Sequence, residues 1–384
     1  MRILVLGGRA PVALEHSRRF ANAGHEVWIG DSVSCHLSAS SQLVRGVITL
    51  PPPRWALDQF ARTLSHAIHT HRFELVLPTC EEVFFLSRIR RRLPASCNVF
   101  VAPFEQLLTL HSKLQFIELA KTVGINVPDT AGVTSLVEAR DWARGRPVVL
   151  KPEFSRFGVH VRIYPSGIPD DSSPLAEQGN WVVQEYRKGR EICSYGISVN
   201  GRLLANVCYE PTYRIKRSSS YYFEPANIPE IENFVRRFVE HLNYTGQISF
   251  DWIISENSSP TIIECNPRAI SGLHLFHSDC QIPAAILGEA TAKFDVNLAR
   301  PKMIAAVMLA IGFPSSVRHG SLRRWLYDWS RASDVLSIRK DRAPLLGAMR
   351  DIGSFVKTSL RQGCSVREAS TRDIEWDGEA LPEC

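Results

Sequence analysis

The stretch FDWIISENSSPTIIECNPR, residues Phe250–Arg268, has the pattern of a β-hairpin. Residues Phe250–Ser255 alternate bulky apolar and polar side chains, and Thr261–Cys265 is a second apolar run. Between them, Glu256–Pro260 has the composition of a turn. The sequence therefore predicts two paired strands late in the chain, and the other motifs are interpreted around them.

The predicted hairpin gathers oxygen-bearing side chains at one point. Glu264 and Asn266 fall on the same face because side chains alternate along a strand. Asp251 lies on the facing strand, where a hairpin of this length can bring it beside Glu264, and Arg268 follows. Carboxylate and amide oxygens suit Mg²⁺, and a metal between two carboxylates offsets their repulsion. The alternative, a surface hairpin with solvated acids, is disfavoured by the apolar residues Ile253, Ile254, Ile262 and Ile263.

Length and composition are those of a globular protein with two or three domains. The chain has 384 residues, and it contains no apolar run of the roughly 18–20 residues needed to cross a bilayer. Its start, MRILVLGG, is typical of a core strand and not of a signal peptide. Nine cysteines without a C-x-x-C pair indicate free thiols in a reducing compartment. We therefore expect a cytoplasmic protein without a membrane partner.

Positive charge is concentrated late in the chain. The net charge is +6, and Arg318 to Arg372 contains twelve Lys/Arg against five Asp/Glu. A nucleic-acid partner is disfavoured because no reader motif or aromatic platform accompanies these charges.

The N-terminus has the pattern of a doubly wound α/β domain. Arg2–Leu6 and His25–Gly30 are predicted strands, joined by a Gly7-Gly8 turn and a helix. The turn lacks the full G-x-G-x-x-G, so it is weak evidence for a dinucleotide. Thr79 and Glu81 follow another predicted strand and are candidate substrate contacts, although a helix N-terminus is the favoured interpretation of this segment.

Two lysines stand where phosphate groups could be held. Lys113 lies near the start of a helix within the helical stretch Pro103–Gly124, and Lys151 closes the apolar strand Pro147–Leu150. The loop Glu153–Gly158 follows Lys151, and backbone N–H groups of such loops can cradle phosphate oxygens. Taken singly, each lysine is equally compatible with an ordinary solvated or strand-end side chain.

Three further segments carry candidate ligand contacts. Gln184 and Glu185 lie at the end of a predicted strand, and a glycine turn and then Glu191 follow them. This segment could form a hinge that holds adenine and ribose. The alternative is a turn flanked by two exposed acids. The basic, aromatic segment Tyr213–Phe223 has no clean period and is predicted to be a loop that closes over substrate. A Gly-hinged segment follows the hairpin, and its His274 could contact a substrate or be a core histidine.

These motifs, in this order and at this spacing, resemble the ATP-grasp superfamily, on its carbamoyl-phosphate-synthase-like and biotin-carboxylase-like side. The resemblance rests on SKLQFIELAKTVGINVPDT, VVLKPEFSRFGVHV, VVQEYRKGRE and the hairpin, and it covers roughly residues 1–300. It implies an α/β and α+β fold with four parts: a Rossmann-like domain (1–105), a small lid subdomain (106–183), a large subdomain with the metal site (184–312) and a basic C-terminal extension (313–384). One departure is the bulky loop after Lys151, which has a single glycine, Gly158.

The resemblance also implies roles for individual residues. ATP would lie between the two subdomains with Mg²⁺, or Mn²⁺ in its place, held by Asp251, Glu264 and Asn266. Arg268 and Lys151 would act on the transferred phosphoryl group. Nucleotide contacts would come from Lys113, Lys151, Arg156, Gly158, Gln184, Glu185, Tyr186 and Glu191. Substrate contacts would come from Thr79, Glu81, Arg214, Lys216, Ser271 and His274.

The expected activity is ligation of a small-molecule carboxylate, activated as an acyl phosphate, to an amine or thiol. A bicarbonate-activating carboxylase is one alternative, and a non-catalytic ATP-binding regulatory module is another. The substrates and the oligomeric state, a homodimer included, stay open at the level of sequence.

Overall fold

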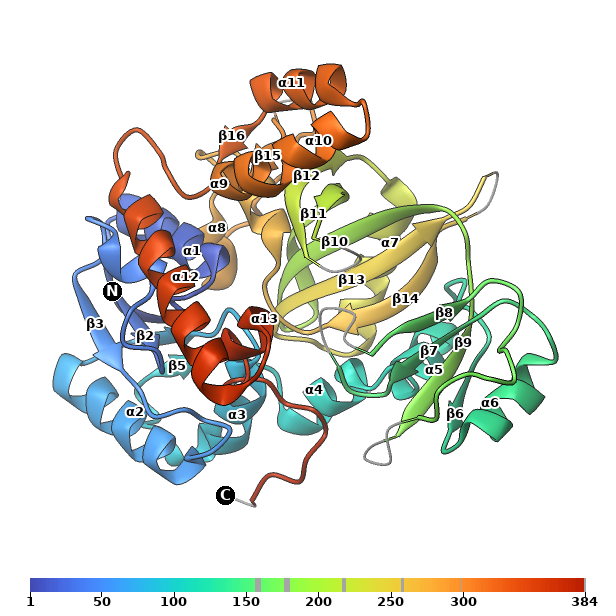
Figure 1. Cartoon of the computed structure of the whole chain (residues 1–384). Coiled ribbons are helices and arrows are strands. Elements are labelled where there is room, and N and C mark those ends of the chain that lie inside the picture. The colour runs from blue at the N-terminus through green and yellow to red at the C-terminus, as the bar shows by residue number, and fades with distance from the viewer. Residues whose placement is uncertain (156–159, 176–179, 216–218, 257–258, 298, 383–384) are drawn as a thin grey trace.

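The computed structural model describes residues 1–155, 160–175, 180–215, 219–256, 259–297 and 299–382. Its strands form three sheets, which follow one another along the chain (Figure 1). The α/β and α+β fold class predicted from the sequence is confirmed. None of the helices in these ranges combines the length and the apolar composition that crossing a bilayer requires.

The N-terminal sheet is parallel, with the strand order β3-β2-β1-β4-β5. Its order reverses between β1 and β4, so Gly7 after β1 and Thr79 after β4 flank the point where open α/β sheets bind ligands. Gly7 has φ +78°, and a Cβ there would lie 2.6 Å from Thr79 Oγ1. The elements are β1 (Arg2–Leu6), α1 (Pro11–Asn22), β2 (Glu26–Asp31), η1 (Leu37–Ser40), β3 (Gly46–Thr49), α2 (Leu57–His71), β4 (Leu75–Leu77), α3 (Glu82–Ile89), η2 (Arg90–Arg92) and β5 (Asn98–Val99).

A small antiparallel sheet follows, with the order β6-β9-β7-β8. Its apolar side is built from alternate strand residues, Val148, Leu150, Trp181 and Val183, and α6 packs on them. The elements of this part are α4 (Phe104–His111), α5 (Gln115–Thr122), β6 (Thr130–Val133), α6 (Leu136–Ala143), β7 (Val148–Pro152), β8 (Arg162–Tyr164) and β9 (Trp181–Glu185).

The large sheet has the order β14-β13-β10-β11-β12-β15-β16. Helix α7 covers one face, where Phe234 and Phe238 pack on Phe250 and Trp252. Its elements are β10 (Arg190–Val199), β11 (Arg202–Arg214), β12 (Ser220–Ala226), α7 (Pro229–His241), β13 (Gly246–Ile254), β14 (Thr261–Asn266), η3 (Ser271–Leu275), α8 (Ile282–Ile286), β15 (Lys302–Met303) and β16 (Ser333–Asp334).

The last part of the chain returns to the N-terminal domain. Figure 1 shows α10 and α11 above the large sheet, whereas α12 crosses the front of the N-terminal domain and the final segment runs on below it. The helices are α9 (Ala305–Val307), the π-helical η4 (Met308–Gly312), α10 (Phe313–Arg318), α11 (Leu322–Arg331), α12 (Ala343–Gln362) and α13 (Val366–Ala369).

Two local predictions are wrong. The helical stretch Pro103–Gly124 is broken at 112–114 into α4 and α5, although Lys113 does lie next to the start of a helix, α5, as predicted. The predicted loop Tyr213–Phe223 is largely the ends of β11 and β12, because Tyr221, Tyr222 and Phe223 are buried and hold these residues in the sheet. Residues 216–218 lie outside the described residues.

Candidate functional site

The two hairpin carboxylates face each other across β13 and β14. The strand register pairs Asp251 with Glu264, and Ser249 with Asn266. Phe250 and Trp252 turn towards α7 on the other face, so the period of two sends Asp251 to the face opposite this aromatic cluster. The predicted hairpin is therefore confirmed, with Asp251 beside Glu264, although a register shift between Asp251 and Trp252 interrupts the pairing.

The two carboxyls differ in their proton affinity. Burial, with the Glu264 charge beside it, raises the pKa of Asp251 to about 7. Burial would also raise the pKa of Glu264, but the positive charges of Lys113 and Lys151 outweigh it and lower this pKa to about 2. Glu264 is thus the carboxylate on which the two lysine charges converge.

Lys151 is the penultimate residue of β7 in the small sheet, and its side chain reaches the large sheet. Its Nζ donates to Gln184 Oε1 at 3.0 Å and to the Ile263 carbonyl at 3.4 Å, next to Glu264. Burial lowers its pKa to about 8, although Glu264 counteracts this shift. The lysine therefore bridges the two sheets beside the carboxylate pair.

Lys113 is held by the loop that follows Lys151. Its Nζ donates to the Ser155 carbonyl at 2.9 Å and to the Glu153 carbonyl at 3.3 Å, and burial lowers its pKa. The side chain of Glu153 fixes this loop because it accepts from Ser112 Oγ and, at 3.0 Å, from Asn180 Nδ2. Arg156 and Gly158 lie outside the described residues, so their predicted contacts stay predictions.

The predicted nucleotide hinge joins the small sheet to the large one. Gln184 is buried, and its Nε2 donates to Thr130 Oγ1 at 3.0 Å. The backbone N–H groups of Glu185 and Tyr186 donate to the carbonyls of Asp129 and Pro147 at 2.8 and 3.1 Å. The alternating strand pattern of β9 thus points Gln184 towards Lys151, as the hinge predicted from the sequence would require.

Glu191 forms an ion pair with Arg214, which also lies close enough to Asp251 to lower its pKa. Arg214, predicted as a substrate contact, is therefore brought to the hairpin site. Lys216, named with it, lies outside the described residues.

Arg268 connects the hairpin to the N-terminal domain. Its Nη2 donates to Asn266 Oδ1 at 3.2 Å, and its Nε lies 3.6 Å from a carboxylate oxygen of the buried Glu81. Asn266 Nδ2 in turn faces Glu264 Oε1 at 3.4 Å, so its amide links the arginine to the metal-site candidate. Thr79 Oγ1 instead donates to the Leu6 carbonyl at 2.8 Å, which is an internal bond of the N-terminal domain.

The segment after the hairpin does not join this cluster. Ser271 and His274 lie on η3, and His274 Nδ1 is 3.6 Å from Glu15 of α1. His274 is buried and stacks on Phe223. His274 also lines a cavity with Glu15 and Lys302, so its predicted contact with a substrate stays a prediction beside the core alternative.

The donor set suits Mg²⁺ more than a transition metal. Within the described ranges no three His, Cys, Asp or Glu side chains gather as a metal site. The hairpin offers two carboxylates and an amide instead, and Mg²⁺ in nucleotide sites commonly takes one or two carboxylates, with phosphate and water completing its shell.

Sequence reasoning missed a C-terminal strap, residues 370–382, that lies against this region. Trp376 is buried among the rings of Phe84, Phe104, His111 and Phe154, the last of which belongs to the loop after Lys151. Trp376 Nε1 donates to the Glu379 carbonyl at 2.8 Å.

His111, one of the rings that pack on Trp376, is neutral. Burial lowers the pKa of His111 to about 3, and the charges of Lys113 and Arg268 add to this shift.

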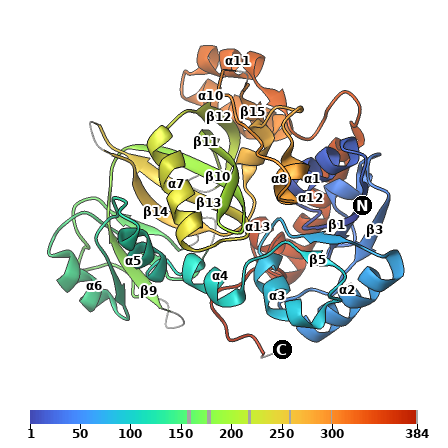
Figure 2. The ribbon, with the colours of Figure 1, turned by 180° about the vertical axis from the view of Figure 1, so that it is seen from behind.

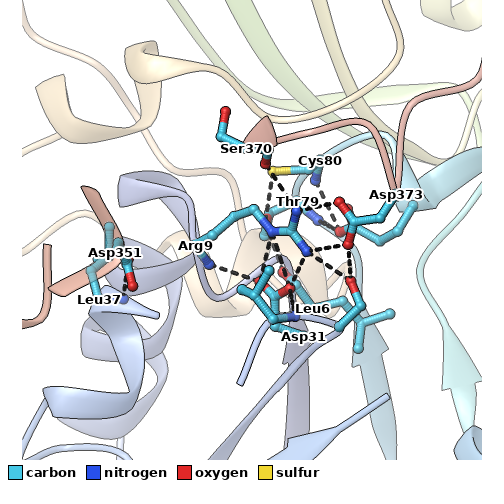
Figure 3. A network of polar contacts seen from close by, with 12 residues as sticks. Leu6, Arg9, Asp31, Leu37, Thr79, Cys80, Asp351, Ser370 and Asp373 are labelled. Carbon is cyan, nitrogen blue, oxygen red and sulfur yellow. Dashed lines mark hydrogen bonds and ion pairs between the residues drawn. The ribbon is translucent and has the colours of Figure 1, made fainter. Parts of the chain in front are cut away.

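Arg9, in the turn after Gly7-Gly8, anchors the strap (Figure 3). Its guanidinium donates to Asp31 of β2 and to Asp373 of the strap, with Nη1 2.6 Å and Nη2 2.8 Å from the Asp373 oxygens. Ser32 Oγ also donates to Asp373, and Arg9 Nη1 donates to the Ser370 carbonyl at 2.9 Å. The network joins the first strands of the chain to its end.

Several solved structures share the overall fold of the chain. An N5-carboxyaminoimidazole ribonucleotide synthetase in complex with ADP matches with TM-score 0.65 and 12% identity, over 81% of this chain and 85% of that one. The biotin carboxylase domain of the Hydrogenobacter thermophilus 2-oxoglutarate carboxylase matches with TM-score 0.60 and 14% identity, over 77% and 72% of the chains. An L-amino acid ligase from Bacillus licheniformis matches with TM-score 0.58 and 14% identity, over 78% of each chain.

No family model matches the sequence, and no curated protein matches it. The likeness is therefore one of structure, and the order of strands, lysines and carboxylates agrees with the resemblance seen in the sequence. The chain has the ATP-grasp fold, preceded by a parallel α/β domain.

Proposed function

We propose that the protein is an ATP-dependent ligase that activates a small-molecule carboxylate as an acyl phosphate for attack by an amine or a thiol. The observation that carries this proposal is the convergence of Lys113 and Lys151 on Glu264, which is paired with Asp251. The lysines come from the small sheet and the helices before it, and the carboxylates from the large sheet. Such a cluster between two subdomains suits a nucleotide triphosphate with its metal ion.

In this proposal the chain supplies charge and position. Lys113 and Lys151 offset negative charge on the phosphates, and Asp251, Glu264 and Asn266 hold Mg²⁺, which neutralises charge on the transferred phosphoryl group when bound. Gln184 orients Lys151, while Glu185, Tyr186 and Glu191 line the adenosine end. Arg268 stands between the hairpin and Glu81, where it would meet the acyl phosphate.

Bond making and breaking would follow in two steps. A carboxylate oxygen attacks the γ-phosphorus, and the bond to the ADP oxygen breaks. The amine or thiol then attacks the acyl carbon, phosphate leaves, and the proton of the nucleophile is released. Water must be kept out because an acyl phosphate hydrolyses.

The first experiment measures ADP release with Mg·ATP against a panel of carboxylic acids, alone and with amines or thiols. Release that needs both an acid and a nucleophile, with the coupled product seen by mass spectrometry, is the expected result. An L-amino acid ligase is among the solved structures that share the fold, so pairs of amino acids are the first arm.

A bicarbonate arm tests the alternative chemistry. The biotin carboxylase domain that shares the fold was solved with MgADP and bicarbonate. ADP release that depends on bicarbonate, without an amine or thiol product, would replace the ligase proposal by a carboxylase. Binding of Mg·ATP by calorimetry with no ADP from any combination would replace it by a regulatory ATP-binding module.

A further inference from the structure

Exposed apolar side chains are concentrated near the end of the chain. Thirteen of the eighteen large apolar side chains that are exposed within the described residues lie between Leu309 and Val366. Five of them belong to α12, with exposed fractions of 62, 64, 56, 39 and 80%: Leu346, Met349, Ile352, Val356 and Leu360. Their spacings of three and four positions place them on one face of the helix.

The opposite face of α12 fixes this orientation. Asp351 is buried and accepts from the Leu37 backbone N–H of η1 at 2.7 Å. A Cβ on Gly347 would lie 2.7 Å from Ser40 Oγ, so the glycine allows the helix to approach η1 closely. In Figure 1 no element lies over the outer side of α12, and in Figure 2 α1 lies on its inner side. The apolar stripe therefore faces outward.

The exposed charge of α12 has one sign. Arg350, Lys357 and Arg361 are exposed on the helix, and Arg342 is exposed at its N-cap. The one acid of α12, Asp351, is buried. Among nearby acids, Asp328 and Asp341 are buried, and Asp334 accepts from two backbone N–H groups. The exposed Glu368 of α13 is engaged by Ser365 in a capping box. The outer face of α12 is thus apolar and cationic.

We propose that α12 binds the surface of a membrane that contains anionic lipids, lying in the interface with its apolar stripe inserted. An amphipathic helix with basic and large apolar side chains on its free face binds in this way. This revises the expectation from sequence of no membrane partner, which rested on the lack of a spanning segment. A helix that lies on a bilayer needs no such segment.

A second copy of the chain fits this face less well. Pairing of two α12 faces would bring their arginines and lysines together, and the exposed residues of α12 offer no acid to offset them. Anionic headgroups supply that charge, and the acyl region receives the five apolar side chains.

The test is co-sedimentation of the full chain with vesicles, without nucleotide, so that it does not depend on the proposed activity. Vesicles of phosphatidylcholine with about one third phosphatidylglycerol should bind at least about tenfold more protein than phosphatidylcholine alone, and added salt should weaken binding. The triple variant Leu346→Gln/Met349→Gln/Leu360→Gln should reduce binding about tenfold or more. Val137→Gln on α6, at a side chain that is 62% exposed, should leave it unchanged.

A charge variant separates headgroup attraction from insertion. Arg350→Gln/Lys357→Gln/Arg361→Gln should weaken binding to anionic vesicles, whereas Arg236→Gln/Arg237→Gln on α7 should not. Binding to neither kind of vesicle would overturn the proposal, as would equal binding to both. A wild-type dimer in sedimentation velocity that the Leu346/Met349/Leu360 variant turns into a monomer, with no vesicle binding, would assign α12 to a second copy.

Discussion

Turnover by Glu264→Gln should fall by about 10²–10⁴-fold, with the fold retained. Bound Mg²⁺ contributes several kcal/mol of charge stabilisation in phosphoryl transfer, and each 1.36 kcal/mol is tenfold in rate. The substitution keeps the shape of the side chain but removes the carboxylate on which Lys113 and Lys151 converge. Single-turnover ADP formation at saturating ATP measures the loss directly.

Folding stability should change much less than activity in this variant. The Glu264 charge helps to raise the pKa of Asp251 to about 7. Without it, Asp251 ionises more readily at neutral pH and supplies one negative charge to the two lysines in place of Glu264. We therefore expect a change in the free energy of unfolding of about 1–2 kcal/mol by urea denaturation, within the usual range for single substitutions.

The matched control is Glu210→Gln in β11 of the same large sheet. Glu210 forms a surface ion pair with Arg190, with 3.5 Å between N and O, so its loss should leave turnover near that of the wild type. Equal losses of activity and stability in Glu264→Gln would contradict the catalytic role, because they would describe a carboxylate that only holds the structure together.

The parts of the fold predicted from sequence are those fixed by local patterns. The period of two around Asp251 decides which face of β13 it occupies, and a register shift between Asp251 and Trp252 sets it opposite Glu264. Lys151 could be placed in the same way because it ends an apolar strand. In each case the deciding residues are neighbours in the chain.

Residues whose position depends on distant partners could not be found in this way. Trp376 is fixed by rings from α3, α4 and the loop after Lys151, and no periodic pattern surrounds it. The sequence predicted a loop for the aromatic run Tyr221–Phe223. Its strand conformation depends on pairing with β11 and on burial under η4 and α11, and the local sequence does not reveal these contacts. Local propensity gives no signal for such contacts.

The strap gives the second large prediction: Arg9→Met should destabilise the protein by about 3–5 kcal/mol, because loss of one partner leaves a buried charge uncompensated. Arg9 pairs with Asp31, whose side chain is 1% exposed, and with Asp373, 364 positions away in sequence. Urea denaturation at pH 7 measures the change. Limited proteolysis with mass analysis should show earlier cleavage after residue 363 than in the wild type, since the strap loses its anchor.

The pH dependence of this loss has a definite sign. Burial would raise the pKa of Asp31, but the Arg9 guanidinium outweighs it and holds this pKa below its ordinary value. In the wild type the pair therefore stabilises the fold above the unfolded pKa of Asp31, and this contribution is lost as the pH falls through the lower, folded value. In Arg9→Met the guanidinium no longer opposes burial, which leaves His36 and the Val33 backbone N–H to do so, and the pKa of Asp31 therefore rises. Protonation then removes the uncompensated charge. The stability gap between the two proteins should narrow as the pH falls from 7 towards 4.

Arg54→Met separates this buried anchor from an ordinary surface contact on the same strap. Arg54 pairs with Asp377 at 2.7 Å and Glu379 at 3.0 Å, but the three side chains are 22 to 44% exposed, so their loss should cost about 1 kcal/mol or less. Similar losses in the two variants would contradict the anchoring role of Arg9. They would mean that the strap is held by its aromatic contacts, with Trp376 packed against the loop that positions Lys113.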